Sequence, residues 1–282
     1  MPASLTDRFF TPPPLAPVRT IGWSQPFIWL NKAFLDIANA PLISLAHGLI
    51  LILIGAAIWG VGHNRFWLMA GALSGFLVVG PLVATSLYSI SRAIERGETA
   101  NWNLIRTTWT QWQSCHATGR GGYWCMVKFG ALLALAATGW VLISASLITV
   151  MSPVQVETLQ DFMTHVVLAK DGQLFMQWMA LGSFLAAPIF ASSVVAMPLM
   201  LDRRVTVRQA VLTSWSVVLA NPVPMALWAA LIVLLTLLGL GSYLLGLLVV
   251  MPLLGHASWH AYRDLVDASA FQSRDEPIEP AA

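Results

Sequence analysis

Apolar residues occur along this chain in long, nearly uncharged runs, and the length of each run indicates its structure. A helix needs about 20 mostly apolar residues to cross a bilayer. Six runs reach or approach this length, over residues 42–61, 66–90, 126–150, 173–201, 222–238 and 241–259. Only Gly239-Leu240-Gly241-Ser242 separates the last two, which predicts a tight hairpin broken at these glycines. The pattern predicts an all-α integral membrane protein with about six transmembrane helices.

A shorter amphipathic segment precedes each pair of long runs. Their apolar positions are Phe27, Leu30, Phe34 and Ile37; Trp102, Ile105, Trp109 and Trp112; and Val207, Val211, Trp215 and Val218. Apolar faces beside basic residues are typical of helices that lie in the cytoplasmic membrane interface. The alternative is that they are ordinary loop helices packed on the bundle.

Between the third and fourth runs, Ser152-Pro153-Val154-Gln155 has the pattern of a capping box with proline at the first helical position. An apolar stripe follows at Val156, Leu159, Met163 and Val166. The pattern predicts an amphipathic helix over the external mouth of the bundle.

An internal repeat relates the runs to one another. The segment Gly75–Leu82 returns in the same register at Gly246–Leu253, and a glycine with proline six residues later occurs in the second run of every pair. The three pairs are Gly75 and Pro81, Gly182 and Pro188, and Gly246 and Pro252. Glycine allows close helix approach and proline kinks a helix. The repeat predicts three parallel hairpins, each preceded by an interfacial helix.

The distribution of charge predicts the orientation. The chain is 57% hydrophobic and only 10% charged, which excludes a typical soluble domain, and its net charge of +2 gives no reason to expect nucleic acid as a partner. Six spans place thirteen of the fifteen Lys and Arg residues on one side, and only Arg65 and Lys170 on the other. Because basic loops stay in the cytoplasm, both termini are predicted to be cytoplasmic.

The ends of the chain have a different composition. Residues 1–24 are rich in proline, and residues 269–282 end in an acidic, proline-containing stretch. Segments of this kind bury little apolar surface. We therefore expect disordered cytoplasmic tails on both sides of a membrane domain over residues 25–268.

Histidine offers the clearest candidate chemistry. All thirteen Asp and Glu residues fall in tails, loops or the ends of the runs, which disfavours a proton-coupled carrier. His256 and His260 share one face of the sixth run, and His47 lies at similar depth in the first. Imidazoles from two helices could hold a b-type haem or a transition metal. The alternative, and our prediction, is that they hydrogen-bond within the bundle and that the protein has no cofactor and no metal site.

Several segments resemble a known family. Residues 75–98, 219–228 and 246–266 are similar to the bacterial integral-membrane family catalogued as domain of unknown function 2189, and the most specific part is the run from Pro252 to Arg263. The resemblance covers about residues 25–268. It implies a multi-span inner-membrane protein without an assigned activity, although some members are labelled as cytochrome c oxidase subunits. It supports His256, Trp259, His260 and Arg263 as a shared motif.

Three functions remain open from the sequence. The first is a non-enzymatic structural, assembly or scaffolding protein, acting in the bilayer and beside another membrane complex. The second is a permease-like protein for a neutral or lipid-like solute, with a polar cavity near the kinked helices. Its expected lining is Ser74, Thr85, Ser86, Ser192 and Ser193. The third is a haem- or metal-binding respiratory accessory subunit, which requires a ligand such as His47 across a haem-sized gap from His256 or His260.

Overall fold

The computed structural model describes residues 15–62, 66–114 and 124–274; the side chains of residues 73, 74, 76–82, 110–114 and 124–127 lie outside that description. In the described part of the chain the regular structure is helical, which confirms the all-α prediction. The helices are α2 (Gln25–Asn39), α3 (Pro41–Gly62), α4 (Phe66–Glu95), α5 (Trp102–Ser114), α6 (Trp124–Met151), α7 (Leu159–Phe162), α8 (Gln173–Ser193), α9 (Ala196–Asp202), α10 (Val207–Ala220), α11 (Pro222–Gly241) and α12 (Leu247–Leu265). A π-helical turn, Met163–Val167, continues α7, and a 3₁₀ turn spans Ala268–Ala270.

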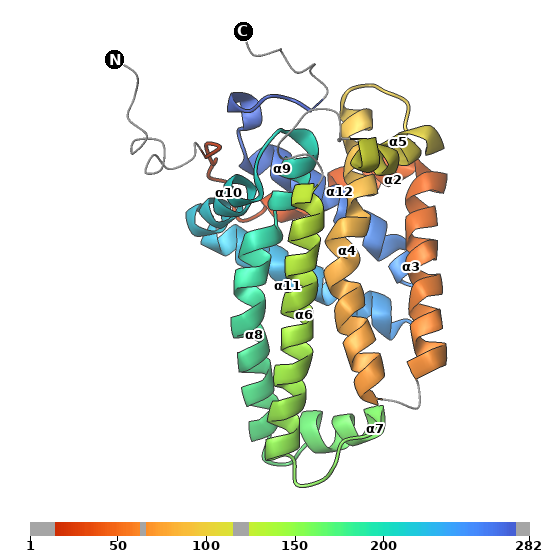
Figure 1. Ribbon diagram of the computed structural model, residues 1–282, viewed down its shortest axis with the longest axis vertical. Helices are drawn as coiled ribbons and strands as arrows, with labels where there is room; N and C mark the ends of the chain where they lie inside the picture. The colour runs from red at the N-terminus through yellow and green to blue at the C-terminus, as the bar shows by residue number, and fades with distance from the viewer. Residues whose placement is uncertain (1–14, 63–65, 115–123, 275–282) are drawn as a thin grey trace.

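The long helices α3, α4, α6 and α8 stand side by side and give the molecule its length (Figure 1). The short helices α2, α5, α9 and α10 gather at one end, together with the C-terminal half of α12, and α7 lies at the opposite end. We call these the hub end and the α7 end. Four segments of the described chain are long and apolar enough to span a membrane: Pro41–Gly62, Lys128–Met151, Gln173–Asp202 and Pro222–Gly241.

Local sequence signals explain where several helices begin. Both α3 and α11 begin at a proline, whose fixed φ and missing N–H suit the first helical position. A capping box begins α10, because the Thr206 hydroxyl accepts from the Gln209 N–H while the Gln209 side chain accepts from the Thr206 N–H.

The helix predicted after Ser152 begins later than its sequence pattern indicated. The Ser152 hydroxyl donates to the Val154 carbonyl, and the capping box forms instead between Thr158 and Asp161. The Thr158 hydroxyl and the backbone N–H groups of Thr158 and Glu157 stabilise the Asp161 carboxylate and lower its pKa. The capping-box prediction at Ser152–Gln155 was therefore wrong.

Parts of the two segments that were predicted to be disordered tails pack against the membrane domain. Val18 pairs with Val266 in an isolated antiparallel bridge, and the Arg19 N–H donates to the Leu265 carbonyl. The Asn221 side chain accepts from the Ile21 N–H and donates to the Arg19 carbonyl. Residues 203 and 273 form a second bridge. Residues 15–24 and 269–274 thus pack on the hub end, whereas the rest of both expected tails lies outside the described residues.

The connection between α11 and α12 is a tight turn, although not at the predicted glycines. Tyr243 and Leu244 occupy the left-handed region with φ of 56° and 71°. The Ser242 hydroxyl closes the turn by accepting from the Gly246 N–H at 2.8 Å. A Cβ at Gly246 would lie 2.9 Å from the Gly239 Cα, so glycine at 246 permits the close return of the chain.

Helix α12 packs closely on α3 and α4. A Cβ added to Gly48 would meet the backbone of Leu248, lying 2.7 Å from its Cα. Seven residues further along α12, a Cβ added to Gly255 would collide with the Leu87 side chain. Neither Gly48 nor Gly255 belongs to the glycine–proline pairs that the repeat singled out. These close contacts place α12 within the bundle at the hub end.

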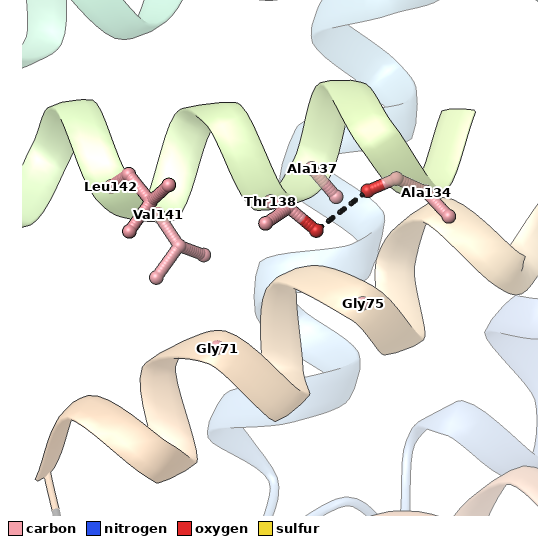
Figure 2. A pocket seen from close by; sticks show the side chains of 7 residues that line it. All are labelled: Gly71, Gly75, Ala134, Ala137, Thr138, Val141 and Leu142. Atoms are coloured by element: carbon pink, nitrogen blue, oxygen red, sulfur yellow. Dashed lines mark hydrogen bonds between the residues drawn. The ribbon is translucent and has the colours of Figure 1, made fainter. Parts of the chain in front are cut away.

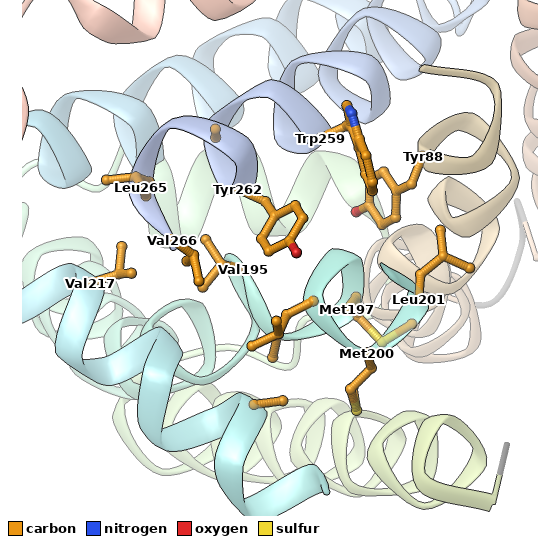
Figure 3. Close-up of a cluster of buried hydrophobic side chains, with 14 of the residues drawn as sticks. Tyr88, Val195, Met197, Met200, Leu201, Val217, Trp259, Tyr262, Leu265 and Val266 are labelled. Carbon is orange, nitrogen blue, oxygen red and sulfur yellow. The ribbon is translucent and has the colours of Figure 1, made fainter. Parts of the chain in front are cut away.

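The largest apolar cluster surrounds the second half of α12 (Figure 3). Tyr262 points from α12 toward Met197 of α9, and Trp259 and Leu265 belong to the same buried cluster. Trp29 packs edge-on against Trp228, with ring centroids 5.5 Å apart. Burial of this size makes the hub end the stable core of the described structure.

Candidate functional site

Five polar side chains from four helices form one buried hydrogen-bonded cluster, which we call the Asp36 network. Its members are Asp36 of α2, Ser44 of α3, Ser91 of α4, and His256 and His260 of α12. The Ser91 hydroxyl donates to Asp36 Oδ2 at 2.6 Å, and His260 Nε2 lies 2.8 Å from the same oxygen. His256 reaches Ser91 Oγ with Nδ1 at 2.7 Å and Ser44 Oγ with Nε2 at 3.0 Å.

The direction of these bonds fixes the state of His256. The single Ser91 proton points to Asp36, so Ser91 can only accept from His256, whose Nδ1 must carry the hydrogen. In the neutral imidazole Nε2 is then an acceptor, and the Ser44 hydroxyl donates to it. An activated nucleophile would need a histidine oriented directly by an acid, whereas here Ser91 lies between His256 and Asp36. Ser44 and His256 are also fully buried, and they line neither of the two cavities described below.

The third predicted histidine takes a different partner. His47 Nδ1 lies 2.7 Å from the Ile43 carbonyl of its own helix. The structure brings His256 and His260 together through Asp36, whereas His47 is outside that network. The haem hypothesis requires a gap between opposed imidazoles. Directly after His47, helices α3 and α12 instead approach each other so closely that a Cβ at Gly48 would meet the backbone of Leu248. In the described residues no group of three or more His, Cys, Asp and Glu side chains is placed to hold a metal ion.

Other polar residues of α12 also bind neighbouring elements. The Trp259 indole donates to Glu95 Oε2 at 3.0 Å, and Arg263 donates to Glu95 Oε1 at 2.9 Å. Glu95 is the last residue of α4, so both members of the predicted Trp259 and Arg263 motif hold the end of that helix. The side chain of Asp264 accepts from Gln25 at 2.6 Å and from Trp29 at 2.8 Å, which anchors the first turns of α2.

A second buried carboxylate lies between α12, α4 and the end of α9. Asp202 Oδ2 accepts from the Tyr262 hydroxyl at 2.8 Å and from Arg203 at 3.0 Å. Its other oxygen lies 3.2 Å from Arg92 Nε and 3.9 Å from Arg96. A buried carboxylate that is paired and hydrogen-bonded in this way lowers the stability of the fold only a little. Removal of one of its partners would destabilise the fold strongly.

The glycine–proline pairs have different surroundings in the three hairpins. Gly71 and Gly75 of α4 face Ala134, Ala137 and Thr138 of α6 across a cavity of about 300 Å³ (Figure 2). Gly182 permits a close approach, because a Cβ there would lie 2.9 Å from the Trp140 ring. Pro188 and Pro252 both lie inside helices, α8 and α12. The side chain of Pro81 is outside the described residues.

Two of the hydroxyls predicted to line a solute pathway bind a neighbouring helix instead. Ser86 accepts from the Trp109 indole at 2.8 Å, and Ser192 accepts from the Trp215 indole at 2.9 Å. The Ser193 hydroxyl donates to the Ile189 carbonyl of its own helix. Thr85 is fully buried, and Ser74 is outside the described side chains.

Sequence reasoning missed Asp36, Ser44 and Ser91. The signal for Asp36 was its spacing: Trp29, Ala33 and Asp36 repeat at four and three residues and form the buried face of α2. The serines carried no comparable signal, since Ser44 is an isolated hydroxyl in an apolar run and Ser91 is one of several hydroxyls near the end of the second run. Only the packing of α3 and α4 on α12 brings them to the histidine.

These features define an all-helical integral membrane protein in which at least four described segments can span a bilayer. Residues 68–202 match the family described as "Predicted integral membrane protein (DUF2189)". The resemblance is thereby confirmed for the first of its three segments, whereas residues 219–228 and 246–266 lie beyond the match. The comparisons with curated proteins and with solved structures found no match.

Proposed function

We propose that this protein is a non-enzymatic scaffold of the bacterial inner membrane, with its helices held around the C-terminal half of α12. The observation that carries the proposal is the use of the polar side chains there. His256, His260, Tyr262 and Arg263 bind groups on α2, α3, α4 and α9. Buried side chains committed to interhelical hydrogen bonds specify one helix arrangement, which is what a scaffold needs.

Six spans are the number that we propose. Besides the four membrane-capable segments, they include α4, which has 30 residues and packs on α3 and α6. They also include α12, which packs on α3, α4 and α11. At the hub end, Arg92, Arg203 and Arg263 surround the polar networks, whereas Lys170 follows α7 at the other end. This asymmetry supports a cytoplasmic hub end and cytoplasmic termini.

Three repeated hairpins are supported by a cyclic pattern of contacts. The hairpins are α3–α4, α6–α8 and α11–α12. Helix α5 packs on α4, α10 packs on α8, and α2 packs on α12, so each short helix covers the second helix of the preceding hairpin and α2 closes the circle.

The bonds across these pairs are also alike. An indole donates across each pair, from Trp109 to Ser86, from Trp215 to Ser192 and from Trp29 to Asp264. Ser89 and His260 occupy equivalent positions in the first and third copies. Each binds the covering helix, Ser89 through Thr108 and His260 through Asp36.

The short helices have the exposed apolar faces expected at a membrane interface. Phe27 and Phe34 of α2 are 47% and 60% exposed, and Trp102 of α5 is 55% exposed. Leu212, Trp215 and Leu219 of α10 are also exposed. Such faces can insert among lipid headgroups and acyl chains. They support an interfacial position of α2, α5 and α10, while Leu30, Val211 and Val218 of the predicted faces pack against the bundle.

A scaffold is favoured over a solute pathway because the predicted pathway hydroxyls, Ser86, Ser192 and Ser193, are engaged in bonds within the bundle. The test is native electrophoresis of membranes dissolved in mild detergent, with the protein at its chromosomal expression level. We expect one assembly with a second membrane protein at fixed stoichiometry. Tyr262→Phe, which loosens the hub end, should lower the assembled fraction, whereas the exposed control Tyr243→Phe should not. A wild-type chain that migrates alone would contradict the proposal.

A further inference from the structure

A larger cavity lies at the α7 end, away from the Asp36 network. Its volume is about 900 Å³, and its walls come from α3, α4, α6, α7, α8 and the turn between α11 and α12. Aromatic side chains dominate the walls; they include Trp59, Trp67, Trp140, Phe162, Trp178 and Tyr243. Pockets that bind small molecules are typically about 300–1,000 Å³ in volume, so this cavity is large enough for a ligand.

The chemistry of the walls selects an uncharged ligand. The residues that line the cavity include no Asp, Glu, Lys or Arg. The Ser144 hydroxyl is already occupied, since it accepts from the Trp178 indole at 2.6 Å. The remaining surface consists of aliphatic and aromatic groups, which gain free energy from contact with hydrocarbon. A charged headgroup would find no opposite charge among these lining side chains.

The position of the cavity selects the source of that hydrocarbon. Two of its walls, α3 and α6, are membrane-capable segments, and their outer faces carry exposed apolar side chains such as Leu53 and Leu135. Two lining residues reach the surface, because Trp59 is 55% exposed and Tyr243 is 92% exposed. The cavity is therefore continuous with a surface that acyl chains contact. Tyr243 and Leu244, both with positive φ, hold the rim in a conformation that side chains rarely adopt.

We propose that this cavity binds one acyl chain of a membrane phospholipid, with the headgroup outside the rim at Trp59 and Tyr243. The inference goes beyond the scaffold and does not depend on it, because the cavity shares no residue with the Asp36 network. Tyrosine and tryptophan are suited to this rim, since their rings are apolar and their polar atoms can face the headgroup region.

The experiment uses the full chain reconstituted in vesicles of phosphatidylethanolamine and phosphatidylglycerol that contain a phospholipid with a photoreactive diazirine at the end of one acyl chain. After illumination, mass spectrometry maps the labelled residues. We expect labels on inner walls of the cavity, around Ser144 and Trp178, in addition to labels on the lipid-facing surface.

Matched variants on α3 make the result specific. Ala56 and Ala57 are adjacent and both are exposed, but only Ala56 lines the cavity. Ala56→Trp should lower labelling of the inner walls about tenfold, because the new ring replaces several methylene contacts, whereas Ala57→Trp should leave it unchanged. Thermal unfolding of both variants checks that each is folded. Labels confined to outward-facing residues, or equal inner labelling in the two variants, would overturn the proposal. A protein segment that filled the cavity would give the first of these results.

Discussion

Replacement of Gly48 by alanine should destabilise the bundle more than its size suggests. The new Cβ would lie 2.7 Å from the Leu248 Cα, and the atoms it meets belong to the backbone of α12, which cannot rotate away. Carbon atoms pack best at about 3.5–4.0 Å, so α3 and α12 would have to separate by about 1 Å. Overpacking of this kind costs about 1–3 kcal/mol, and the contacts of the Asp36 network lie at the same interface.

The matched control is Gly60→Ala in the same helix. A Cβ at Gly60 meets nothing within 4 Å, and alanine favours helix over glycine by about 1 kcal/mol. The free energy of unfolding of both variants can be measured by SDS titration in mixed micelles. We expect Gly48→Ala to be less stable than the wild type by about 1–3 kcal/mol and Gly60→Ala to be at least as stable as the wild type. Equal stability of the two variants would refute the close contact of α3 with α12.

Three further results follow from the structure. Tyr262→Phe should lose about 1.5–3 kcal/mol of stability, because its hydroxyl donates to the buried Asp202 carboxylate, while Tyr243→Phe should be neutral in the same titration; equal losses would count against the Asp202 contact. Single cysteines can be introduced in a background that lacks Cys115 and Cys125. In intact spheroplasts, Lys170→Cys should react with a membrane-impermeant maleimide and Glu98→Cys should not. The reverse pattern would invert the topology. The purified protein should show no Soret band, since both nitrogens of His256 are engaged by serines; a Soret band that His256→Ala abolishes would establish the haem alternative.

The positions of the helices were largely predictable because they depend on local signals. Pro41 and Pro222 mark the starts of α3 and α11, and four of the six apolar runs coincide with single helices. The fourth run is divided between α8 and α9, and the sixth begins six residues before α12. The turn between α11 and α12 was less predictable, since it uses Tyr243 and Leu244 at positive φ rather than the glycines before it. Glycine is the residue that usually adopts positive φ, and here the packing around the turn holds tyrosine and leucine in that conformation instead.

The buried site was harder to predict because hydrophobicity does not identify the inside of a membrane protein. In α2 the apolar side chains of Phe27 and Phe34 face outward, while Asp36 faces the bundle beside Trp29. Lipid solvates apolar surface as well as a protein core does, so polar and small residues are the ones that mark helix contacts. The two histidines at 256 and 260 did indicate the site, although their partners came from distant parts of the chain.

A double-mutant cycle between Asp36 and His260 tests most directly whether the polar side chains of α12 hold the bundle together. The stability of Asp36→Ala, His260→Ala and the double variant is measured by SDS titration, with Lys170→Ala paired with Asp36→Ala as the uncoupled reference. The direct contact at 2.8 Å predicts that the two losses are not additive, with a coupling energy of about 1–3 kcal/mol. Losses that add to within about 0.5 kcal/mol, as in the reference pair, would contradict the Asp36 network as the element that ties α2 to α12.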